Sequence, residues 1–313
     1  MTDYVLGIDT SAYTTSVALT DFNTGEVIAD KRMVLSVPIG KKGLRQQDAV
    51  FQHLKNFCRL YDEVEAELRN IKIVSVSSRP RNVEGSYMPV FTVGQGYGKA
   101  IARTLGCKYV EYSHQENHIA ASLIDKYKEI NKNILAIHMS GGTTEFLSVA
   151  KAKKGYVAGI QGGSKDITFG QLIDRVGTIM GFSFPCGVHM EKYLESNFKI
   201  VNIKTPAISG ESYINLSGME NYYSNLYLSG KYNKESIINS MFKYVAECIL
   251  HIVNSIKPKY YFDTIILAGG VASNVIIRSL VVEKLNRYNV IFPTKENSSD
   301  NAAGVSFLPI IDR

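Results

Sequence analysis

The sequence lacks the features of an exported or membrane protein. No apolar run approaches the roughly 20 residues that a membrane-spanning helix needs, and the first residues have no basic region of the kind that opens a signal peptide. Only four cysteines occur, and no two of them form a C-x-x-C pair. We therefore expect a cytoplasmic protein with reduced thiols, without a disulfide framework, a zinc ribbon or an association with a membrane.

Acidic residues are in the minority, with 29 Asp and Glu against 35 Lys and Arg, for a net charge of +6. The chain also has 19 tyrosines. This balance is compatible with an RNA or nucleotide partner, although charge alone favours a solvated basic surface. The basic residues stand in small groups: Lys41, Lys42 and Arg45; Arg79 and Arg81; Lys151, Lys153 and Lys154; Lys257 and Lys259.

One short pattern occurs twice, in residues 4–19 and 133–149. Each copy is an apolar run, a turn of small residues and a second apolar run, which predicts a β-hairpin. Its tip would carry hydroxyls and free backbone N–H groups that can hold a phosphate. Two copies indicate two related domains that face a shared nucleotide cleft. The matching residues are Ser11, Thr14 and Thr15 with Ser140, Thr143 and Thr144.

Strand-like and helix-like runs alternate in the order βββαβα, and this order occurs twice. The pattern predicts an α/β fold of two RNase-H-like halves. The repeat places the domain border near residue 112, with domains of 1–112 plus 296–313 and of 113–295. The segment 195–235 has no assignment. Helices are expected at 48–69, 93–105, 114–130, 167–180, 236–255, 273–287 and about 300–308.

His114 and His118 are four residues apart on a predicted helix, so both imidazoles face one side, within reach of a single metal ion. Glu116 occupies neither position that a zincin or an inverzincin protease needs, which disfavours a metalloprotease. Asp300 could supply a third, oxygen ligand from the other domain, leaving open positions for a substrate. Two exposed helical histidines and a plain helix N-cap at Asp300 are the alternatives.

Two further stretches could bind a nucleotide. Gly269 and Gly270 follow a strand and precede a helix, where a base or ribose can approach the backbone closely and Asn274 can hydrogen-bond it. Any tight strand–helix turn can carry such glycines. Asp174, inside an apolar helix, could accept from a ribose hydroxyl, or could form a surface salt bridge with Arg175 or Lys165.

Together these blocks resemble the tRNA threonylcarbamoyladenosine synthases, threonylcarbamoyl transferases formerly called O-sialoglycoprotein endopeptidases or the glycoprotease family. These belong to the actin-like ATPase superfamily, with sugar kinases and heat-shock chaperones, so the resemblance implies two such domains around a cleft. It covers nearly the whole chain in the same order, and the combination is specific although each piece is not. It implies a metal site, of Fe or Zn, at His114, His118 and Asp300.

The resemblance also implies sites for ATP or threonylcarbamoyl-adenylate. The opening turn with Asp9 and Ser11 would assist the S-G-G-x-T loop on the phosphate side. Asp174, Gly187, Glu191, Gly269, Gly270 and Asn274 match motif positions that would seat the adenosine. The implied loop consists of His138, Met139, Ser140, Gly141, Gly142 and Thr143.

The chain departs from the family where S-C-D-E-T is usual, because Tyr13 and Thr14 replace the two acids. No general base is evident, and orientation of the adenine amine is then the expected source of acceleration. The implied function is threonylcarbamoyl transfer from the adenylate to the adenosine next to the tRNA anticodon, within a complex of partner proteins. The alternatives are a diverged paralogue with another carbamoyl or acyl acceptor, or a non-catalytic nucleotide-binding partner. A sugar kinase or chaperone ATPase would not need the histidine pair.

Overall fold

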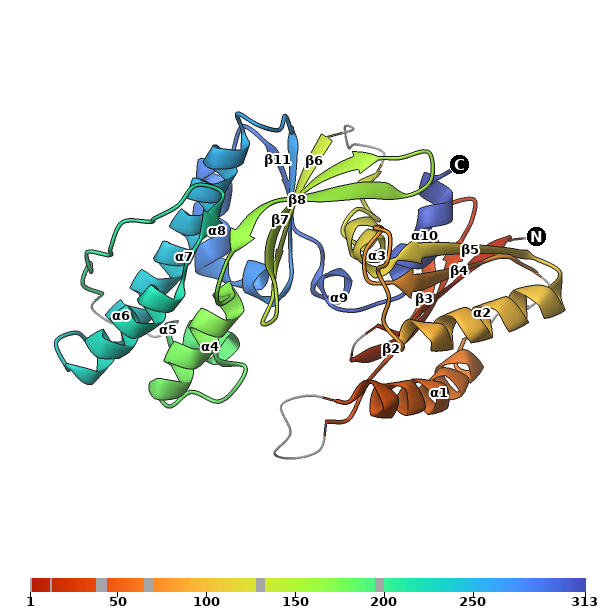
Figure 1. Cartoon of the computed structure of the whole chain (residues 1–313), viewed down its shortest axis with the longest axis horizontal. Helices are drawn as coiled ribbons and strands as arrows, with labels where there is room; N and C mark the ends of the chain where they lie inside the picture. Colours follow the sequence, from red (N-terminus) through yellow and green to blue (C-terminus); the bar gives the residue numbers. More distant parts are fainter. Residues whose placement is uncertain (1, 12, 38–43, 65–69, 128–132, 195–199) are drawn as a thin grey trace. The chain divides into compact units, whose positions relative to one another are not determined.

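The computed structural model describes residues 2–11, 13–37, 44–64, 70–127, 133–194 and 200–313 (Figure 1). The chain forms two compact units. Unit 1 comprises Met1–Ile130, Lys151–Val157 and Pro293–Arg313, and unit 2 comprises Asn131–Ala150 and Ala158–Phe292. Each unit is built around its own sheet.

The sheet of unit 1 has the order β3-β2-β1-β4-β5. β1 pairs antiparallel with β2 and parallel with β4, while β2–β3 is antiparallel and β4–β5 is parallel. Central strands of this kind are buried on both faces, which explains the apolar runs of β1 and β4. The strands are β1 (Tyr4–Asp9), β2 (Thr14–Asp21), β3 (Val27–Val34), β4 (Ile71–Arg79) and β5 (Lys108–Ser113).

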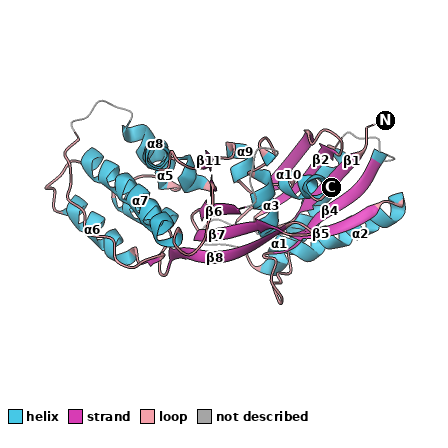
Figure 2. Ribbon diagram, turned by 90° about the horizontal axis from the view of Figure 1, so that it is seen from above, coloured by secondary structure: helices cyan, strands magenta, loops and turns pink. Residues whose placement is uncertain are grey.

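Helices cover both faces of this sheet (Figures 1 and 2). Helices α1 (Gln46–Asp62) and α2 (Phe91–Leu105) cover one face, where Ile8 points. Helices α3 (His114–Ala121) and α10 (Ala303–Ile311) lie on the other face, and the short α9 (Lys295–Ser298) precedes α10. Because Gly7 of β1 has no side chain, α10 packs directly on the strand: a Cβ there would lie 2.7 Å from the Cβ of Ser306.

The sheet of unit 2 has the order β11-β10-β6-β7-β8-β9. Its run β8-β7-β6-β10-β11 repeats the order of unit 1, again with an antiparallel β6–β7 pair and parallel β6, β10 and β11. The expected α/β fold of two RNase-H-like halves is thereby confirmed. The strands are β6 (Asn133–Met139), β7 (Thr144–Lys151), β8 (Tyr156–Ser164), β9 (Tyr213–Ile214), β10 (Thr264–Ala268) and β11 (Asn289–Ile291).

Helix α7 (Lys234–Ile256) is the core helix of unit 2, flanked by further helices (Figure 2). It is the single helix among the described residues that is long and apolar enough to cross a membrane, but 78% of its apolar window is buried inside the protein. The other helices are α4 (Phe169–Ile179), α5 (Cys186–Leu194), α6 (Ser217–Leu228) and α8 (Val275–Lys284), with a 3-10 turn at Gly270–Ser273.

Several predicted boundaries differ from the structure. The helix expected at 48–69 ends at Asp62, and the one expected at 114–130 ends at Ala121. Their predicted ends at 65–69 and 128–130 lie outside the described residues, as do Lys41 and Lys42. The unassigned segment 195–235 contains β9 and α6, and residues 195–199 lie outside the description. Helix α3 belongs to unit 1, beyond the expected border near 112, because it packs against α10.

Candidate functional site

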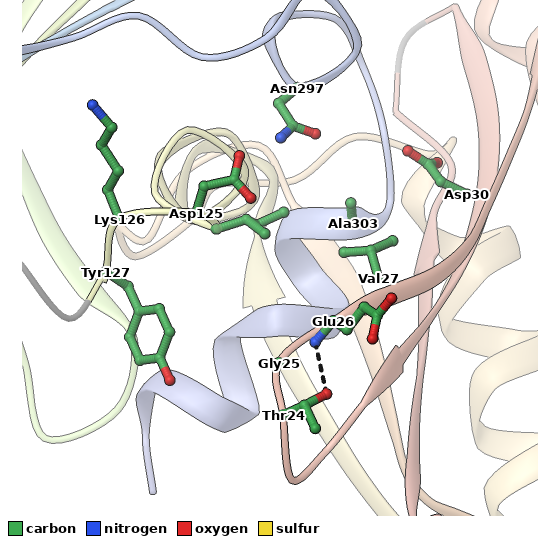
Figure 3. A pocket seen from close by; sticks show the side chains of 11 residues that line it. Thr24, Gly25, Glu26, Val27, Asp30, Asp125, Lys126, Tyr127, Asn297 and Ala303 are labelled. Carbon is green, nitrogen blue, oxygen red and sulfur yellow. Dashed lines mark hydrogen bonds between the residues drawn. The ribbon is translucent and has the colours of Figure 1, made fainter.

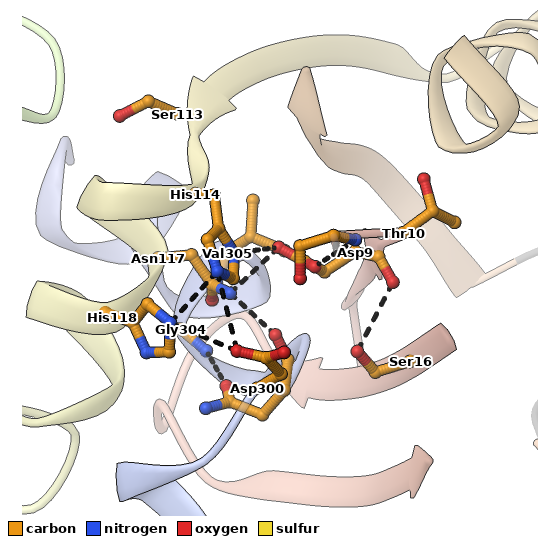
Figure 4. Close-up of polar contacts among 12 residues, drawn as sticks. Asp9, Thr10, Ser16, Ser113, His114, Asn117, His118, Asp300, Gly304 and Val305 are labelled. Carbon is orange, nitrogen blue, oxygen red and sulfur yellow. Dashed lines mark hydrogen bonds and ion pairs between the residues drawn. The ribbon is translucent and has the colours of Figure 1, made fainter. Parts of the chain in front are cut away.

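His114, His118 and Asp300 converge on one point in unit 1 (Figure 4). The two Nε2 atoms lie 3.0 Å apart, and Asp300 Oδ1 lies 3.5 Å from His114 Nε2 and 3.4 Å from His118 Nε2. Ligands about 2.0–2.2 Å from one ion in a tetrahedral shell are roughly 3.3 Å apart. The three donor atoms therefore fit the first shell of a single metal ion.

Helix α3 begins at His114, and its start is fixed so that both histidines face the candidate metal site. Ser113 is the N-cap and forms a capping box with Glu116: Ser113 Oγ accepts from the Glu116 N–H (3.2 Å), and Glu116 Oε2 accepts from the Ser113 N–H (2.8 Å). This arrangement satisfies two of the backbone donors that a helix start leaves free. Glu116 is buried and also accepts from the Tyr156 N–H, so it stands apart from the metal ligands, as the spacing predicted.

Asp9 orients the first histidine. Its carboxylate is fully buried at the end of β1; Oδ2 lies 2.9 Å from His114 Nδ1 and accepts from Asn117 Nδ2 (3.1 Å). Oδ1 accepts from the Ser11 N–H (2.9 Å). A carboxylate on one ring nitrogen fixes the tautomer in which the other nitrogen can bind a metal. Asp9 thus orients His114 within the candidate metal site, whereas the sequence pattern had placed it on the phosphate side.

The charges of the centre depend on one another. Burial alone would lower the pKa of His114, but the carboxylates of Asp9 and Asp300 outweigh it and raise this pKa to about 10. Burial would raise the pKa of Asp300, yet its bonds to both histidines hold that pKa well below the ordinary value. A metal ion that binds here would have to displace this proton from His114.

Asp300 is placed by tertiary contacts and not by a helix cap. Helix α10 begins at Ala303 with Ala302 as its N-cap, so the alternative of Asp300 as a plain N-cap is wrong. Asn117 Nδ2 donates to the Asn301 carbonyl (2.6 Å), and Asn117 Oδ1 accepts from the Val305 N–H (2.6 Å). The expectation that Asp300 comes from the other domain is also wrong, because α10 packs on α3 within unit 1.

A second buried histidine lies near Asp9 and was missed in the sequence. His53 of α1 is fully buried, and its Nδ1 lies 2.8 Å from Thr15 Oγ1. Burial outweighs the charge of Asp9 and lowers the pKa of His53 to about 4, so the ring is neutral at pH 7. Its Nε2 has no hydrogen-bond partner among the described residues. A lone histidine in an amphipathic helix gave no signal, because its surroundings come from β1 and β2.

The predicted phosphate loop lies in unit 2, between β6 and β7. The hairpin pattern predicted free backbone N–H groups at this tip. Instead, Ser140 Oγ accepts from the N–H groups of Gly142 (3.2 Å) and Thr143 (3.1 Å). The loop lies against the start of α4, where a Cβ on Gly170 would come within 2.5 Å of the Ser140 carbonyl oxygen. This contact explains the glycine at the helix start.

Two of the predicted adenosine residues of unit 2, Glu191 and Asn274, are hydrogen-bonded to each other, and Asp174 accepts from a backbone N–H. Asn274 Nδ2 donates to Glu191 Oε2 (3.1 Å), whose second oxygen accepts from the Val275 N–H (3.0 Å). Asp174 Oδ1 accepts from the N–H of Cys186 (2.7 Å), the neighbour of Gly187. The salt-bridge alternative for Asp174 fails, because Arg175 pairs with Glu220 instead (2.9 Å).

Gly269, between β10 and the 3-10 turn at Gly270–Ser273, lies against the end of β6. Its φ of +95° is a conformation that side chains disfavour, and a Cβ there would lie 2.2 Å from the Met139 carbonyl oxygen and 3.2 Å from His138 Cδ2. The predicted residues therefore fall into two groups. Asp9, Ser11 and the metal ligands lie in unit 1, while the loop, Asp174, Gly187, Glu191, Gly269, Gly270 and Asn274 lie in unit 2.

A separate cavity of about 580 Å³ lies in unit 1 (Figure 3). Its walls come from the β2–β3 turn, from residues 124–127 and from Asn297 and Ala303. The carboxylates of Glu26, Asp30 and Asp125 line it. None of the metal ligands lines this cavity, and acidic groups alone do not define a ligand.

The fold and the site together define a class, namely actin-like ATPase-fold proteins that carry a His–His–Asp centre. Solved structures agree on the fold: component A of the Acidaminococcus fermentans (R)-2-hydroxyglutaryl-CoA dehydratase matches with a TM-score of 0.55 and 13% identity over 97% of this chain and 96% of that one. A ROK family glucokinase from Streptomyces griseus matches with a TM-score of 0.51 and 10% identity over 97% and 98%.

The chain belongs to the tRNA N6-adenosine threonylcarbamoyltransferase family, which it matches over residues 47–307. A relative that carries this name, from Thermosipho melanesiensis, is 26% identical over 315 residues, which cover 96% of this chain and 92% of the relative. The family resemblance on which the sequence analysis relied is confirmed.

Proposed function

We propose that this protein transfers a threonylcarbamoyl group from its adenylate to N6 of the adenosine next to the anticodon of tRNA. The observation that carries the proposal is the convergence of His114, His118 and Asp300 in a chain of this family. No finding favours a different acceptor or a non-catalytic role.

In this proposal the three residues hold one divalent ion, Fe or Zn. Such an ion, when bound, supplies Lewis-acid stabilisation of developing oxyanion charge. Asp9 keeps the His114 ring in the orientation that directs Nε2 towards the site, and Asn117 links that carboxylate to the Asp300 segment. The ligands are thus arranged before substrate arrives, which is the main requirement for such a centre.

The transfer forms a bond between the adenine amine nitrogen and the carbamoyl carbon, and it breaks the bond from that carbon to the phosphate oxygen of the adenylate. The nitrogen gives up one proton to solvent, and AMP leaves as an anion. Because the adenylate is already activated, orientation can supply much of the acceleration. Tyr13 is exposed and Thr14 is a buried hydroxyl, so neither replaces the usual acids as a base, and no catalytic residue is assigned.

In this proposal, residues of unit 2 bind the nucleotide. The loop of Ser140, Gly141 and Gly142 would contact the phosphate of ATP or threonylcarbamoyl-adenylate. Glu191 and Asn274 are within hydrogen-bond distance of each other and would present acceptor and donor groups to the adenosine. tRNA is the acceptor, and partner proteins of a threonylcarbamoylation complex and a cytoplasmic location belong to the same proposal.

The decisive experiment is a transfer assay with purified protein, metal, pre-formed threonylcarbamoyl-adenylate and unmodified tRNA that decodes ANN codons, supplemented with the partner proteins of a known synthase. We expect threonylcarbamoyl-adenosine in the nucleoside digest by mass spectrometry, and none when this protein is omitted. Absence of product, with metal and nucleotide bound in stoichiometric amounts, would contradict the proposed acceptor and direct the search to other amines.

A further inference from the structure

One arginine ties the segment that carries Asp300 to strand β3. Arg32 Nη1 donates to the carbonyl oxygen of Glu296 (2.5 Å), to Ser299 Oγ (2.8 Å) and to the carbonyl oxygen of Asp300 (3.4 Å). Nε of the same guanidinium donates to Asp30 Oδ1 (3.0 Å), and Nη2 donates to Asp30 Oδ2. All of these residues belong to unit 1. The acceptors on Glu296, Ser299 and Asp300 are 264 to 268 positions from Arg32 in the sequence.

We propose that Arg32 is a positioning residue for the third metal ligand. Its guanidinium holds the backbone at Asp300 and just before it, so that the carboxylate stands within reach of both histidines before a metal ion binds. This inference rests on the proposed metal centre. It adds a residue that neither touches the metal ligands' side chains nor belongs to the motifs that identify the family.

The Asp300 segment needs such a contact because it has no regular structure of its own. Helix α9 has only four residues, Ser299 is extended and α10 begins at Ala303. Asn117 fixes the far side of Asp300 by donating to the Asn301 carbonyl. Arg32 fixes the near side. Without one of the two, the segment would have to be ordered when the metal binds, and that ordering costs affinity.

Asp30 balances the charge of Arg32. This neutralisation allows the guanidinium to lie close to a site for a cation. Both side chains are only 19% exposed, and they form an ion pair. The planar fork of an arginine can hold a carboxylate along one edge while its remaining nitrogen donates elsewhere. Arg32 therefore contributes directional hydrogen bonds to the segment without adding an unbalanced positive charge near the metal.

The test is the affinity of the purified, metal-free protein for Zn²⁺, measured by competition with a chromophoric chelator. Second-sphere substitutions typically cost about 10- to 100-fold in metal affinity, and we expect Arg32→Met to fall in this range with unchanged stoichiometry. Arg32→Lys, which keeps the charge but not the fork, should recover only part of the loss. The matched control is Arg175→Met, which removes an ion pair with Glu220 in unit 2 and should leave Zn²⁺ affinity unchanged.

The outcomes separate this inference from the proposed function. If the unaltered protein binds no Zn²⁺, the metal centre fails and the role of Arg32 fails with it. If the unaltered protein binds Zn²⁺ and Arg32→Met binds it equally well, the positioning role alone is overturned. Thermal unfolding in excess EDTA shows whether each variant is folded. Should Arg32→Met be unfolded, Arg32→Lys decides: affinity equal to that of the unaltered protein would overturn the role.

Discussion

At the residue scale, the metal centre is governed by the balance between two histidines and two carboxylates. Asp9 and Asp300 surround His114, and without a metal their negative charge is compensated by a proton on this ring, whose pKa is raised from 6.5 to about 10. Above pH 6.5 the unfolded chain has lost that proton, while the folded protein retains it up to about pH 10. The metal-free fold is therefore stabilised by a proton that rising pH removes.

This charge balance predicts a stability profile that metal reverses. In EDTA, the free energy of unfolding should fall as pH rises from about 6.5 to about 10, because the folded state binds more protons than the unfolded state in this window. With saturating Zn²⁺ the fall should disappear, since the cation replaces the proton. Urea unfolding at a series of pH values measures both profiles.

Two controls sharpen the pH experiment. Asp9→Asn should flatten the EDTA profile, because the largest charge that raises the His114 pKa is gone. His53 changes the free energy of unfolding in the opposite direction and in a lower pH range. Its pKa is lowered to about 4, so the free energy of unfolding rises with pH between about 4 and 6.5. Identical profiles in EDTA and Zn²⁺ would contradict the arrangement of charges described for His114.

At the scale of elements, the centre depends on how closely α10 approaches α3. A Cβ on Gly304 would lie 1.9 Å from the Asn117 carbonyl oxygen and 2.7 Å from the Ala121 nitrogen, both in the backbone of α3. Neither backbone atom can move aside without shifting the helix that carries both histidines. The glycine therefore determines the distance between the element that bears His114 and His118 and the segment that bears Asp300.

This close approach predicts opposite effects for two glycine substitutions. Gly304→Ala should lower the free energy of unfolding by about 1–3 kcal/mol, the usual cost of forcing extra volume into a packed contact. Gly96→Ala, in an exposed position of α2 where a Cβ meets nothing within 4 Å, should raise it by about 0.5–1 kcal/mol through helix propensity. Urea unfolding compares the two, and equal effects would refute the packing argument.

At the scale of the whole molecule, the proposed chemistry is divided between two units. The metal ligands with Asp9 and Asn117 lie in unit 1, and the predicted nucleotide residues around the 140–143 loop lie in unit 2. Because each group is built from residues of one unit, each site should bind its own ligand when the other is removed.

We therefore predict that the two binding activities can be lost separately. The double variant His114→Ala and His118→Ala should lose stoichiometric Zn²⁺ but bind ATP with an affinity within about threefold of the unaltered protein, as independent sites do. Asn274 is the N-cap of α8, where its Oδ1 accepts from the Ile277 N–H (3.0 Å). Asn274→Ala should therefore weaken ATP binding by about 5- to 30-fold, through the loss of a hydrogen bond and of this cap. It should leave the Zn²⁺ affinity unchanged. Metal content by mass spectrometry and ATP titration by calorimetry measure both.

The failure of either arm would have a clear meaning. Unchanged metal content in the double histidine variant would remove the ligand assignment. Loss of ATP binding in that variant, with an unchanged unfolding profile, would show that the nucleotide contacts unit 1 as well.

The sequence by itself determined the fold class and the pairing of His114 and His118 on one helix face, because both depend on local spacing. The repeated strand–turn–strand pattern and the alternation of helices and strands follow periods that the backbone imposes. The i, i+4 spacing of His114 and His118 holds on any helix. Helix ends were predicted less well, since packing and capping decide where a helix stops: the helix expected to start at Asp300 begins at Ala303.

Only the tertiary structure decided that Asp300 joins the histidine pair and which residues surround it. Asp9 meets His114 across 105 positions, and Arg32 meets the Asp300 backbone across 268. His53 is buried because its helix packs on β2, where Thr15 meets its ring. Such contacts arise when strands pair and helices pack, and no period in the sequence encodes them. Hydrogen bonds are short-ranged and directional, so the residues that tune a site become visible only when the folded chain places their atoms within about 3 Å.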